Sequence, residues 1–306
     1  MRKNVSLSAS VALGVLVACV AAALTAVPGS TQTAATLVGA GDIASCSQSN
    51  DSATARLLGN ISGTVYTLGD NVYPRGSAAN FRDCYDPTWG RHKNRTKPSL
   101  GNHEYYDENF NMTTAAGPYF DYFGARAGAR GKGYYSYDRG AWHVVVLNSN
   151  CGKVGGCESD SPQGRWLRND LANNANHRCT MAYFHRPLYS TGTNVAGQDV
   201  KPFWRMLHDH GADLIVNGHA HRYERFAPMT PDGARSDASG IRQIVAGTGG
   251  AGGGDEISYA DAPNLQRVKT DAVGVLKLTL RADSYAWKFV PTAGKTFTDS
   301  GTTNCH

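Results

Sequence analysis

Short apolar runs rich in β-branched residues recur along the chain, and each run stops at a glycine or a polar turn. Runs of this kind are typical of strands whose two faces are both buried. They are Thr36 to Val38, Thr64 to Leu68, His143 to Leu147, Thr180 to Phe184 and Leu214 to Val216. A sheet built from such strands needs other layers of structure on its faces.

Helical stretches lie between these runs. One helix is expected to begin at Ser161-Pro162, because serine can cap a helix and proline suits its first turn. A second helix is predicted from about Val200 to His210, ending at Gly211. Strands that alternate with helices predict an α/β fold, with mixed sheets flanked by helices.

The C-terminal part of the chain has a different pattern. Residues 273–280 and 286–290 are predicted to form an antiparallel pair of strands. Before them, residues 247–254 are rich in glycine. No Lys-Ser/Thr pair follows this segment, so it does not fit a phosphate-binding P-loop, and we expect a flexible loop.

The N-terminus has the layout of a secretory signal peptide. Arg2 and Lys3 precede an uncharged apolar run from about Val11 to Val27, which is short for a membrane-spanning helix. We therefore expect residues 1–35 to hold a signal peptide cleaved between about residues 26 and 35. Residues 36–306 are then a single secreted domain with no transmembrane span.

A lipid anchor is the alternative to free secretion. Leu16-Val17-Ala18-Cys19 resembles the lipobox of bacterial lipoproteins, which would tether the mature protein through Cys19. The residues after Cys19 stay apolar, however, where lipoproteins usually become polar. Free secretion is the favoured interpretation.

Six cysteines remain beyond Cys19, and an even number in an exported chain indicates disulfides. No C-x-x-C pair occurs, which argues against a zinc-thiolate cluster. The proximity of Cys151 and Cys157 predicts one bridge. The other two predicted pairs, which rest only on strand-end positions, are Cys46 with Cys84 and Cys179 with Cys305.

The charge balance points to no polyanionic partner. The net charge of +5 falls to +3 when Arg2 and Lys3 are removed, and we expect no obligate nucleic acid partner. Basic residues gather between Arg91 and Lys97, where they could attract an anionic substrate. An ordinary solvated loop is the favoured explanation for this segment.

Metal-ligand residue types follow several of the predicted strands. The carboxyl ends of strands in an open α/β sheet converge on one crevice, so residues far apart in sequence can meet there. Such residues suit a pair of divalent or trivalent cations, which can clamp the attacking and leaving oxygens of a phosphoryl group. The residues are Asp42, Asp70, Asn102, His185, His219 and His221.

These motifs resemble those of the purple acid phosphatases, within the calcineurin-like metallophosphoesterases. The resemblance covers most of the chain after the signal peptide. It runs from Gly41-Asp42 through Gly69-Asp70-Asn71-Val72-Tyr73 and Gly101-Asn102-His103-Glu104 to the segment Gly218-His219-Ala220-His221-Arg222-Tyr223-Glu224-Arg225. It implies a four-layer α/β/β/α sandwich and a dinuclear metal centre.

The resemblance also implies the ligands of each cation. Asp70 bridges the two metals. Asp42, Tyr73 and His221 hold the first metal, while Asn102, His185 and His219 hold the second.

One position separates this chain from many relatives. The metal-binding histidine that they commonly carry two residues after the first aspartate is Ala44 here. Tyr73 takes its place, as in purple acid phosphatases, and a phenolate stabilises Fe(III). We expect Fe(III) in the first site and Fe(II), Zn(II) or Mn(II) in the second.

Two departures concern substrate binding and chain length. Arg186 follows His185 where similar bacterial sequences often have another histidine, so Arg186 is a candidate contact for phosphate oxygens, with a surface salt bridge as the alternative. The accessory N-terminal domain of the plant enzymes has no counterpart, which makes this the short form.

The expected reaction is hydrolysis of a phosphate ester by a metal-bound hydroxide. His103 is expected to protonate the leaving oxygen, with Glu104 as a supporting partner. The other histidines are expected at the surface or in packing roles; they are His92, His143, His177, His208 and His210.

A phosphomonoesterase acting on a phosphorylated small molecule is the favoured function. A phosphodiesterase acting on nucleotides or phospholipid head groups is the alternative. A non-catalytic metal-binding protein is a third hypothesis, disfavoured by the intact set of ligands.

Overall fold

The computed structural model describes residues 33–107, 109–113, 115–193, 195–252 and 256–306, together with Met1, Lys3, Asn4, Leu7 and Ser8. The chain divides into two units, residues 1–31 and residues 32–306. The apolar run of the expected signal peptide and Cys19 lie outside the described residues. No helix in the described part of the chain is long and apolar enough to cross a membrane.

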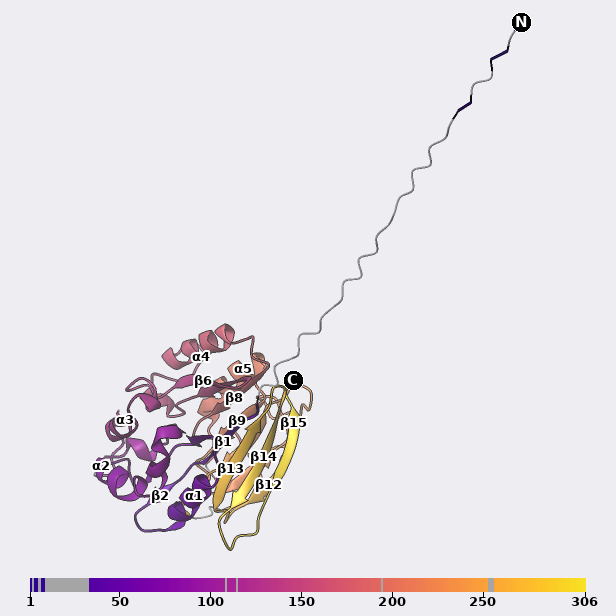
Figure 1. Ribbon diagram of the computed structural model, residues 1–306. Coiled ribbons are helices and arrows are strands. Elements are labelled where there is room, and N and C mark those ends of the chain that lie inside the picture. Colours follow the sequence, from indigo (N-terminus) through magenta and orange to yellow (C-terminus); the bar gives the residue numbers. More distant parts are fainter. Residues whose placement is uncertain are drawn as a thin grey trace. The chain divides into compact units, whose positions relative to one another are not determined.

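The first sheet of the larger unit has six strands in the order β15-β14-β13-β1-β3-β5. Strands β1, β3 and β5 are parallel to one another, and β13 to β15 continue the sheet in antiparallel pairs. The strands are β1 (Ala35–Ala40), β3 (Thr64–Thr67), β5 (Thr96–Lys97), β13 (Gly274–Leu280), β14 (Ser284–Pro291) and β15 (Ser300–Asn304). Figure 1 shows β13, β14 and β15 side by side near the C-terminus.

The second sheet has seven strands in the order β12-β10-β11-β9-β8-β7-β6. Its central strands β11, β9, β8 and β7 are parallel, and antiparallel strands lie at both edges. The strands are β6 (Tyr135–Arg139), β7 (Trp142–Val146), β8 (Cys179–Tyr183), β9 (Leu214–Asn217), β10 (Tyr223–Phe226), β11 (Arg242–Ala246) and β12 (Leu265–Lys269). A separate short parallel pair joins β2 (Ala44–Ser45) to β4 (Val72–Tyr73).

Helices lie on the outer face of each sheet. The α-helices are α1 (Asn50–Gly59), α2 (Ala78–Asn80), α3 (Gly117–Phe123), α4 (Pro162–Asn173) and α5 (Lys201–Asp209). Helices α1 and α3 lie on the first sheet, and α4 and α5 lie on the second. Shorter helical turns are η1 (Phe81–Tyr85), η2 (Trp89–Arg95), η3 (His103–Tyr105), η4 (Gly124–Ala127), η5 (Cys151–Lys153) and η6 (Gln198–Val200).

Three hydrophobic cores separate four layers, because successive residues of a strand point to opposite faces. In β9, Leu214 and Val216 lie in the core between the sheets, whereas Ile215 lies in the core under α4 and α5. In β1, Leu37 faces the core between the sheets and Val38 faces α1 and α3. The predicted α/β/β/α sandwich of two mixed sheets is therefore confirmed.

The predicted elements agree with the structure to within a few residues. All five apolar runs form strands with both faces buried, and the C-terminal pair is the antiparallel pair β13 and β14. The predicted start of α4 is confirmed, since the Ser161 hydroxyl accepts a hydrogen bond from the Gly164 amide at 3.0 Å. The helix predicted from Val200 is α5, preceded by the turn η6.

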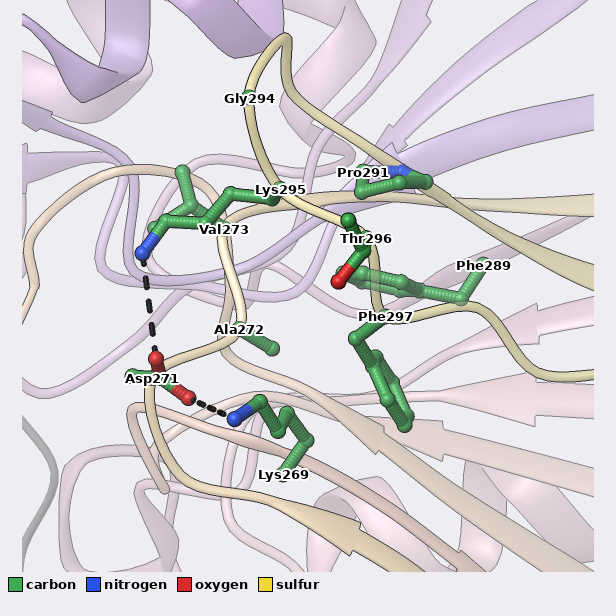
Figure 2. A pocket seen from close by; sticks show the side chains of 10 residues that line it. All are labelled: Lys269, Asp271, Ala272, Val273, Phe289, Pro291, Gly294, Lys295, Thr296 and Phe297. Atoms are coloured by element: carbon green, nitrogen blue, oxygen red, sulfur yellow. Dashed lines mark ion pairs between the residues drawn. The ribbon is translucent and has the colours of Figure 1, made fainter.

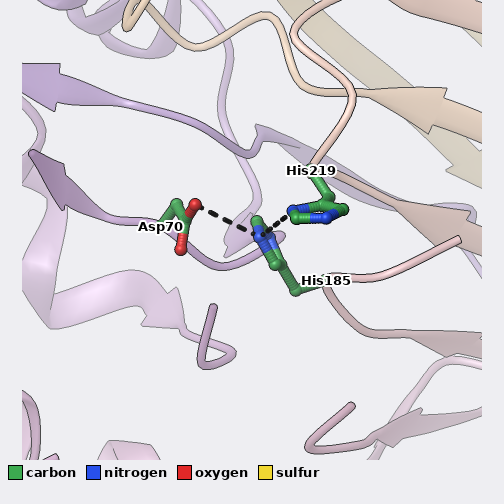
Figure 3. A group of neighbouring side chains, drawn as sticks. All are labelled: Asp70, His185 and His219. Carbon is green, nitrogen blue, oxygen red and sulfur yellow. Dashed lines mark hydrogen bonds and ion pairs between the residues drawn. The ribbon is translucent and has the colours of Figure 1, made fainter. Parts of the chain in front are cut away.

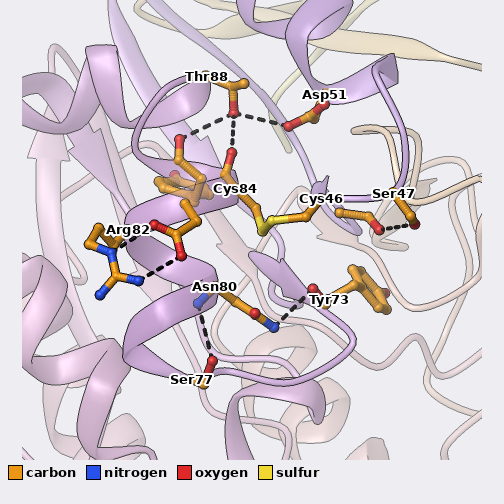
Figure 4. The surroundings of a disulfide bond; sticks show 12 residues. Cys46, Ser47, Asp51, Tyr73, Ser77, Asn80, Arg82, Cys84 and Thr88 are labelled. Carbon is orange, nitrogen blue, oxygen red and sulfur yellow. Dashed lines mark hydrogen bonds and ion pairs between the residues drawn. A yellow bond between two sulfur atoms is a disulfide. The ribbon is translucent and has the colours of Figure 1, made fainter.

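Three disulfides form with the predicted pairing, Cys46 with Cys84, Cys151 with Cys157 and Cys179 with Cys305. Figure 4 shows the first of these, which joins the loop after β2 to η1. Nearby, the Asn80 side-chain amide donates to the Tyr73 carbonyl at 3.0 Å. The bridge thus lies close to the loop that carries Tyr73.

The basic segment between Arg91 and Lys97 has structural contacts. The Arg95 guanidinium donates to the carbonyls of Leu58, Ile61 and Gly63 at 2.6 to 2.9 Å. The Lys93 ammonium lies 4.0 Å from the centre of the Tyr122 ring. The Arg95 contacts hold η2 against the end of α1, and the Lys93 contact joins it to α3. These basic residues therefore have structural partners within the protein.

Candidate metal centre

The predicted ligands gather where strands of both sheets end. Asp42 and Asp70 follow the parallel strands β1 and β3 of the first sheet. His185 and His219 follow the parallel strands β8 and β9 of the second sheet. The site therefore lies at the carboxyl edges of two sheets that pack face to face.

Three of these residues have an unusual backbone conformation. The φ angles of Asp42, Asp70 and His219 are 59°, 47° and 70°. Positive φ is disfavoured for side chains other than glycine, and such strain tends to concentrate at functional sites. In each case the residue whose side chain points into the site has the positive φ angle itself.

The first group of donor atoms surrounds the Tyr73 hydroxyl. The hydroxyl oxygen lies 2.8 Å from Asp42 Oδ1, 2.9 Å from Asp70 Oδ2 and 3.0 Å from His221 Nε2. Asp42 Oδ1 and His221 Nε2 are 3.2 Å apart. Four donor atoms of four residues thus converge, and these are the four residues expected around the first metal.

The β2 and β4 pair explains how Tyr73 takes the place of a ligand at position 44. In the parallel register, Ala44 is opposite Val72 and Ser45 is opposite Tyr73. The methyl side chain of Ala44 offers no donor atom, and the phenol of Tyr73 reaches the group from the neighbouring strand.

The second group surrounds His185, and Figure 3 shows this residue between Asp70 and His219. His185 Nε2 lies 3.0 Å from His219 Nδ1, 3.1 Å from Asn102 Oδ1 and 3.2 Å from Asp70 Oδ2. Asp70 Oδ2 therefore belongs to both groups. A single carboxylate oxygen shared by two sets of donors is the arrangement expected of a bridging ligand.

Two imidazole rings are oriented by backbone carbonyls. His185 Nδ1 lies 2.7 Å from the Leu68 carbonyl, and His221 Nδ1 lies 2.9 Å from the Gly252 carbonyl. A carbonyl only accepts, so each Nδ1 carries the proton and each Nε2 presents its lone pair to the donor group. Histidines that bind metals are commonly oriented in this way.

The pKa values show that the donor groups are strongly coupled. Burial lowers the pKa of His219 to about 3, and the neighbouring His185 adds to the effect. Burial opposes the charge on His185, but Asp70 outweighs it and raises the pKa of His185 to about 9. Burial, together with Asp42 and Asp70, raises the pKa of Tyr73 well above its ordinary value of 10.

These donors fit a pair of cations. Asp42 and Asp70 are almost fully buried, and the phenol between them can ionise at neutral pH only if positive charge is added nearby. The two groups offer carboxylate, phenol, amide and imidazole donors, which suit borderline and hard metal ions. The residues present are therefore able to hold two metal ions that share Asp70.

His103 lies beside the first group without joining it. Its Nδ1 is 2.6 Å from the Pro74 carbonyl and carries a proton toward it, while Nε2 is 3.9 Å from Asp70 Oδ2. The ring lies against that of Tyr73, with 4.3 Å between the ring centres, and its side chain is 27% exposed. Nε2 is the nitrogen left available to a substrate.

Glu104, which was expected to support His103, makes hydrogen bonds to backbone amides instead. Its buried carboxylate accepts from the backbone amides of Gly101, Asp70 and Asn71 at 2.6 to 3.1 Å. Burial and the nearby Asp70 raise its pKa to about 7. Glu104 therefore fixes the two loops that carry Asp70 and Asn102.

The glycine-rich segment is part of the site, and the described residues 247–252 are packed tightly against it. A Cβ atom on Gly247 would lie 2.0 Å from the Ala220 carbonyl oxygen and 2.6 Å from Asp42 Oδ2. The Gly252 carbonyl orients His221. The expectation of a flexible loop was wrong for these residues, because only the folded structure shows which backbone approaches Asp42.

Arg186 lies beside the second group. Its backbone amide donates to the Ser149 hydroxyl, and its buried Nε has no hydrogen-bond partner among the described residues. It borders a cavity of about 180 Å³ that Lys153 and Asn150 also line. A second cavity of about 170 Å³, lined by His221 and Lys295, borders the first group.

A third cavity, of about 120 Å³, contains none of the predicted site residues. Figure 2 shows its lining, where Asp271 pairs with Lys269 at 2.6 Å and with Lys295 at 3.8 Å. Its carboxylate is thus already neutralised by two ammonium groups.

Two mixed sheets packed face to face, with these donors at their common edge, define the metallophosphoesterase class of proteins. The model of the calcineurin-like phosphoesterase family matches residues 36–223, and the chain belongs to this family. Among the proteins that it resembles are purple acid phosphatases.

Purple acid phosphatases are among the curated relatives. Purple acid phosphatase 15 of Arabidopsis thaliana is 29% identical over 199 residues, which are 60% of this chain and 36% of that protein. Purple acid phosphatase 22 of the same plant is 31% identical over 137 residues, 43% of this chain and 30% of that protein. The chain thus spans about a third of the length of these relatives.

Solved structures share the fold. A purple acid phosphatase from yellow lupin seeds superposes with a TM-score of 0.69 at 17% identity, covering 89% of this chain and 54% of that one. The Plasmodium protein GAP50, described as an anchor in the inner membrane complex, superposes with a TM-score of 0.67 at 13% identity, covering 90% of each chain.

Proposed function

We propose that the protein is a phosphomonoesterase of the acid phosphatase type, which hydrolyses a phosphorylated small molecule at a dinuclear metal centre. The observation that carries this proposal is the position of Asp70 Oδ2, which is 2.9 Å from the Tyr73 hydroxyl and 3.2 Å from His185 Nε2. Two cations that share this oxygen would lie close enough to act on one phosphoryl group.

In this proposal the two donor groups supply the ligands. Asp42, Asp70, Tyr73 and His221 would hold Fe(III) in the first site. Asp70, Asn102, His185 and His219 hold Fe(II), Zn(II) or Mn(II) in the second. When bound, the two ions would polarise the phosphoryl oxygens as Lewis acids. They would also lower the pKa of bound water toward neutral pH.

His103 donates the proton to the leaving oxygen. Its Nδ1 proton is held by the Pro74 carbonyl, so the protonated ring offers the Nε2 proton to the substrate. The tilted contact with the Tyr73 ring keeps the His103 ring beside the first donor group.

Arg186 and Lys153 bind the anionic part of the substrate in the cavity of about 180 Å³ that both residues line. Support for this comes from the unpaired Nε of Arg186 and from its positive charge, which contributes to the low pKa of His219. Because no described acidic group forms a salt bridge with Arg186, its charge is available to phosphate oxygens.

The test compares p-nitrophenyl phosphate with bis-p-nitrophenyl phosphate, with metal analysis of the same preparation. The proposal expects two metal ions per chain and faster turnover of the monoester. Faster turnover of the diester would instead identify a phosphodiesterase, acting on nucleotides or phospholipid head groups. Bound metal without turnover of either ester would identify a non-catalytic metal-binding protein.

We also propose that a signal peptide within residues 1–35 is removed on export, with cleavage between about residues 26 and 35, and that residues 36–306 form a single secreted catalytic domain. The three disulfides support an oxidising compartment. N-terminal sequencing of the protein from culture medium should find a start between about residues 27 and 36. A cell-bound, acylated protein beginning at Cys19 would contradict free secretion.

A further inference from the structure

A second cluster of metal-ligand residue types lies at the opposite ends of the strands from the candidate metal centre. Asp138 belongs to β6 and His143 to the beginning of β7, while His177 precedes β8. His185 of the metal centre follows the other end of β8. The sequence analysis expected His143 and His177 to have surface or packing roles, and gave no reason to join them.

Three donor atoms of these residues all lie within 4.8 Å of one another. His143 Nδ1 is 3.0 Å from Asp138 Oδ1, and His177 Nε2 is 3.5 Å from the same oxygen. The His143 side chain is 2% exposed, that of His177 is 18% exposed and that of Asp138 is 54% exposed. His143 is therefore buried on the inner side of the cluster, and Asp138 is open to solvent on its outer side.

The far nitrogen of each imidazole is already engaged. His143 Nε2 lies 2.8 Å from Asp170 Oδ2, and His177 Nδ1 lies 3.2 Å from the Asn174 carbonyl. Both partners accept hydrogen bonds, so both of these nitrogens carry protons. The remaining nitrogens, His143 Nδ1 and His177 Nε2, are the ones that face Asp138.

Asp170 is itself fixed in position. Its Oδ1 accepts from the Ser136 hydroxyl at 2.6 Å, and it belongs to α4. A carboxylate that accepts from the far nitrogen of an imidazole orients the ring and makes its other nitrogen a stronger donor to a cation. His143 has this partner, and His177 has the equivalent backbone carbonyl.

The electrostatics require positive charge between the three donors. Two neutral imidazole lone pairs and a carboxylate oxygen that face one another repel, unless protons or a cation lie between them. Protons alone would leave His143 charged between Asp138 and Asp170. A cation would replace the proton on Nδ1, balance the charge of the Asp138 carboxylate and engage both imidazole lone pairs.

We propose that Asp138, His143 and His177 form a third cation site, separate from the catalytic centre, that takes Zn(II) or a similar borderline ion. Two imidazoles and one carboxylate are a common zinc donor set, and water fills the fourth position on the exposed side of Asp138. The ion joins β6, β7 and the segment before β8. Its function is structural, because no group of the candidate metal centre takes part.

The test is the zinc content of the folded protein after equilibrium dialysis against micromolar zinc, measured by elemental analysis. His177→Ala and Asp138→Asn should each hold one zinc ion fewer per chain than the wild type, and should keep the wild-type turnover of p-nitrophenyl phosphate. Both side chains are partly exposed, so these variants should fold. His208→Ala is the matched control, since it removes a histidine near Asp209 outside the cluster and should keep the full zinc content.

Equal zinc content in the wild type and both variants would overturn the proposal, and would leave a protonated His143 as the charge between Asp138 and Asp170. Diffraction at the zinc absorption edge gives an independent measurement. An anomalous peak among Asp138, His143 and His177 is expected in zinc-equilibrated crystals. Peaks at the catalytic centre alone would also overturn it.

Discussion

The rings of Tyr73 and His103 are in contact at a tilted angle, but the two residues have different neighbours. The phenol oxygen of Tyr73 meets three donor atoms, whereas His103 Nε2 remains 3.9 Å from Asp70. The resemblance to purple acid phosphatases implied the position of Tyr73, and the place of His103 next to Asn102 predicted that it faces the site. The contacts of Glu104 were not predictable, because they depend on which backbone amides two separate loops present to it.

Tyr73→Phe should remove a visible absorption band from the iron-loaded protein. The band arises from charge transfer between a phenolate and Fe(III), and a phenyl ring has no oxygen to supply it. Absorption spectra should be compared at matched iron content, with Tyr106→Phe as the control that keeps the band. A band that survives in Tyr73→Phe would contradict the role of this tyrosine as a ligand.

His103→Ala should keep both metal ions and lose activity in proportion to the basicity of the leaving group. General acid catalysis is worth about 10²- to 10⁴-fold, and it matters most when a basic alkoxide departs. The loss should be much greater on an alkyl phosphate than on p-nitrophenyl phosphate, whose leaving group needs little help.

The exposed His210 provides the control for this experiment, and His210→Ala should retain activity on both substrates. Equal losses on the two substrates in His103→Ala, with both metals retained, would assign His103 to binding or positioning of phosphate. Loss of metal would mean that His103 supports the ligands.

At the scale of the element, the strands were predictable and the glycine-rich segment was not. A strand buried on both faces can be predicted from its consecutive apolar residues, as in β8 and β9, without knowing which elements pack against it. Glycines needed for a close approach carry no such pattern. Gly101 shows the same limit, since a Cβ there would lie 2.1 Å from Asp70 Oδ1, a neighbour far away in sequence.

Gly247→Ala should disrupt the first donor group, because its methyl group would overlap the Ala220 carbonyl and crowd Asp42. We expect loss of most of the bound metal and at least a tenfold loss of activity, of the order that small displacements of catalytic groups produce. Metal analysis and phosphatase assays check this. Gly59→Ala is the control, since an added Cβ meets nothing within 4 Å, and normal metal content in both variants would contradict the close packing.

At the scale of the whole molecule, all three disulfide pairs were predicted, although only the pair of Cys151 and Cys157 followed from proximity. The pairing of Cys179 with Cys305 depends on how the C-terminus returns to the start of β8. That return is a property of the complete fold and cannot be derived from local sequence.

Removing the disulfides should destabilise the protein to different extents. In the chain-entropy model a bridge that closes 126 residues contributes about 5 kcal/mol, and one that closes 6 residues about 2 kcal/mol. Replacing Cys179 and Cys305 by alanine should therefore lower the free energy of unfolding more than replacing Cys151 and Cys157. Guanidinium unfolding curves measure both, and equal losses would show that loop length does not determine the effect.

The two donor groups draw on distant stretches of chain, Asp42 to Asn102 on one side and His185 to His221 on the other. Neither stretch alone offers a complete set of donors for either ion. An ion with full coordination can therefore bind only after both sheets have formed and docked, which makes metal uptake a late event in the maturation of the protein. A chain stalled before β9 would have one disulfide-forming cysteine, Cys179, without its partner Cys305, and it would lack the donors His219 and His221.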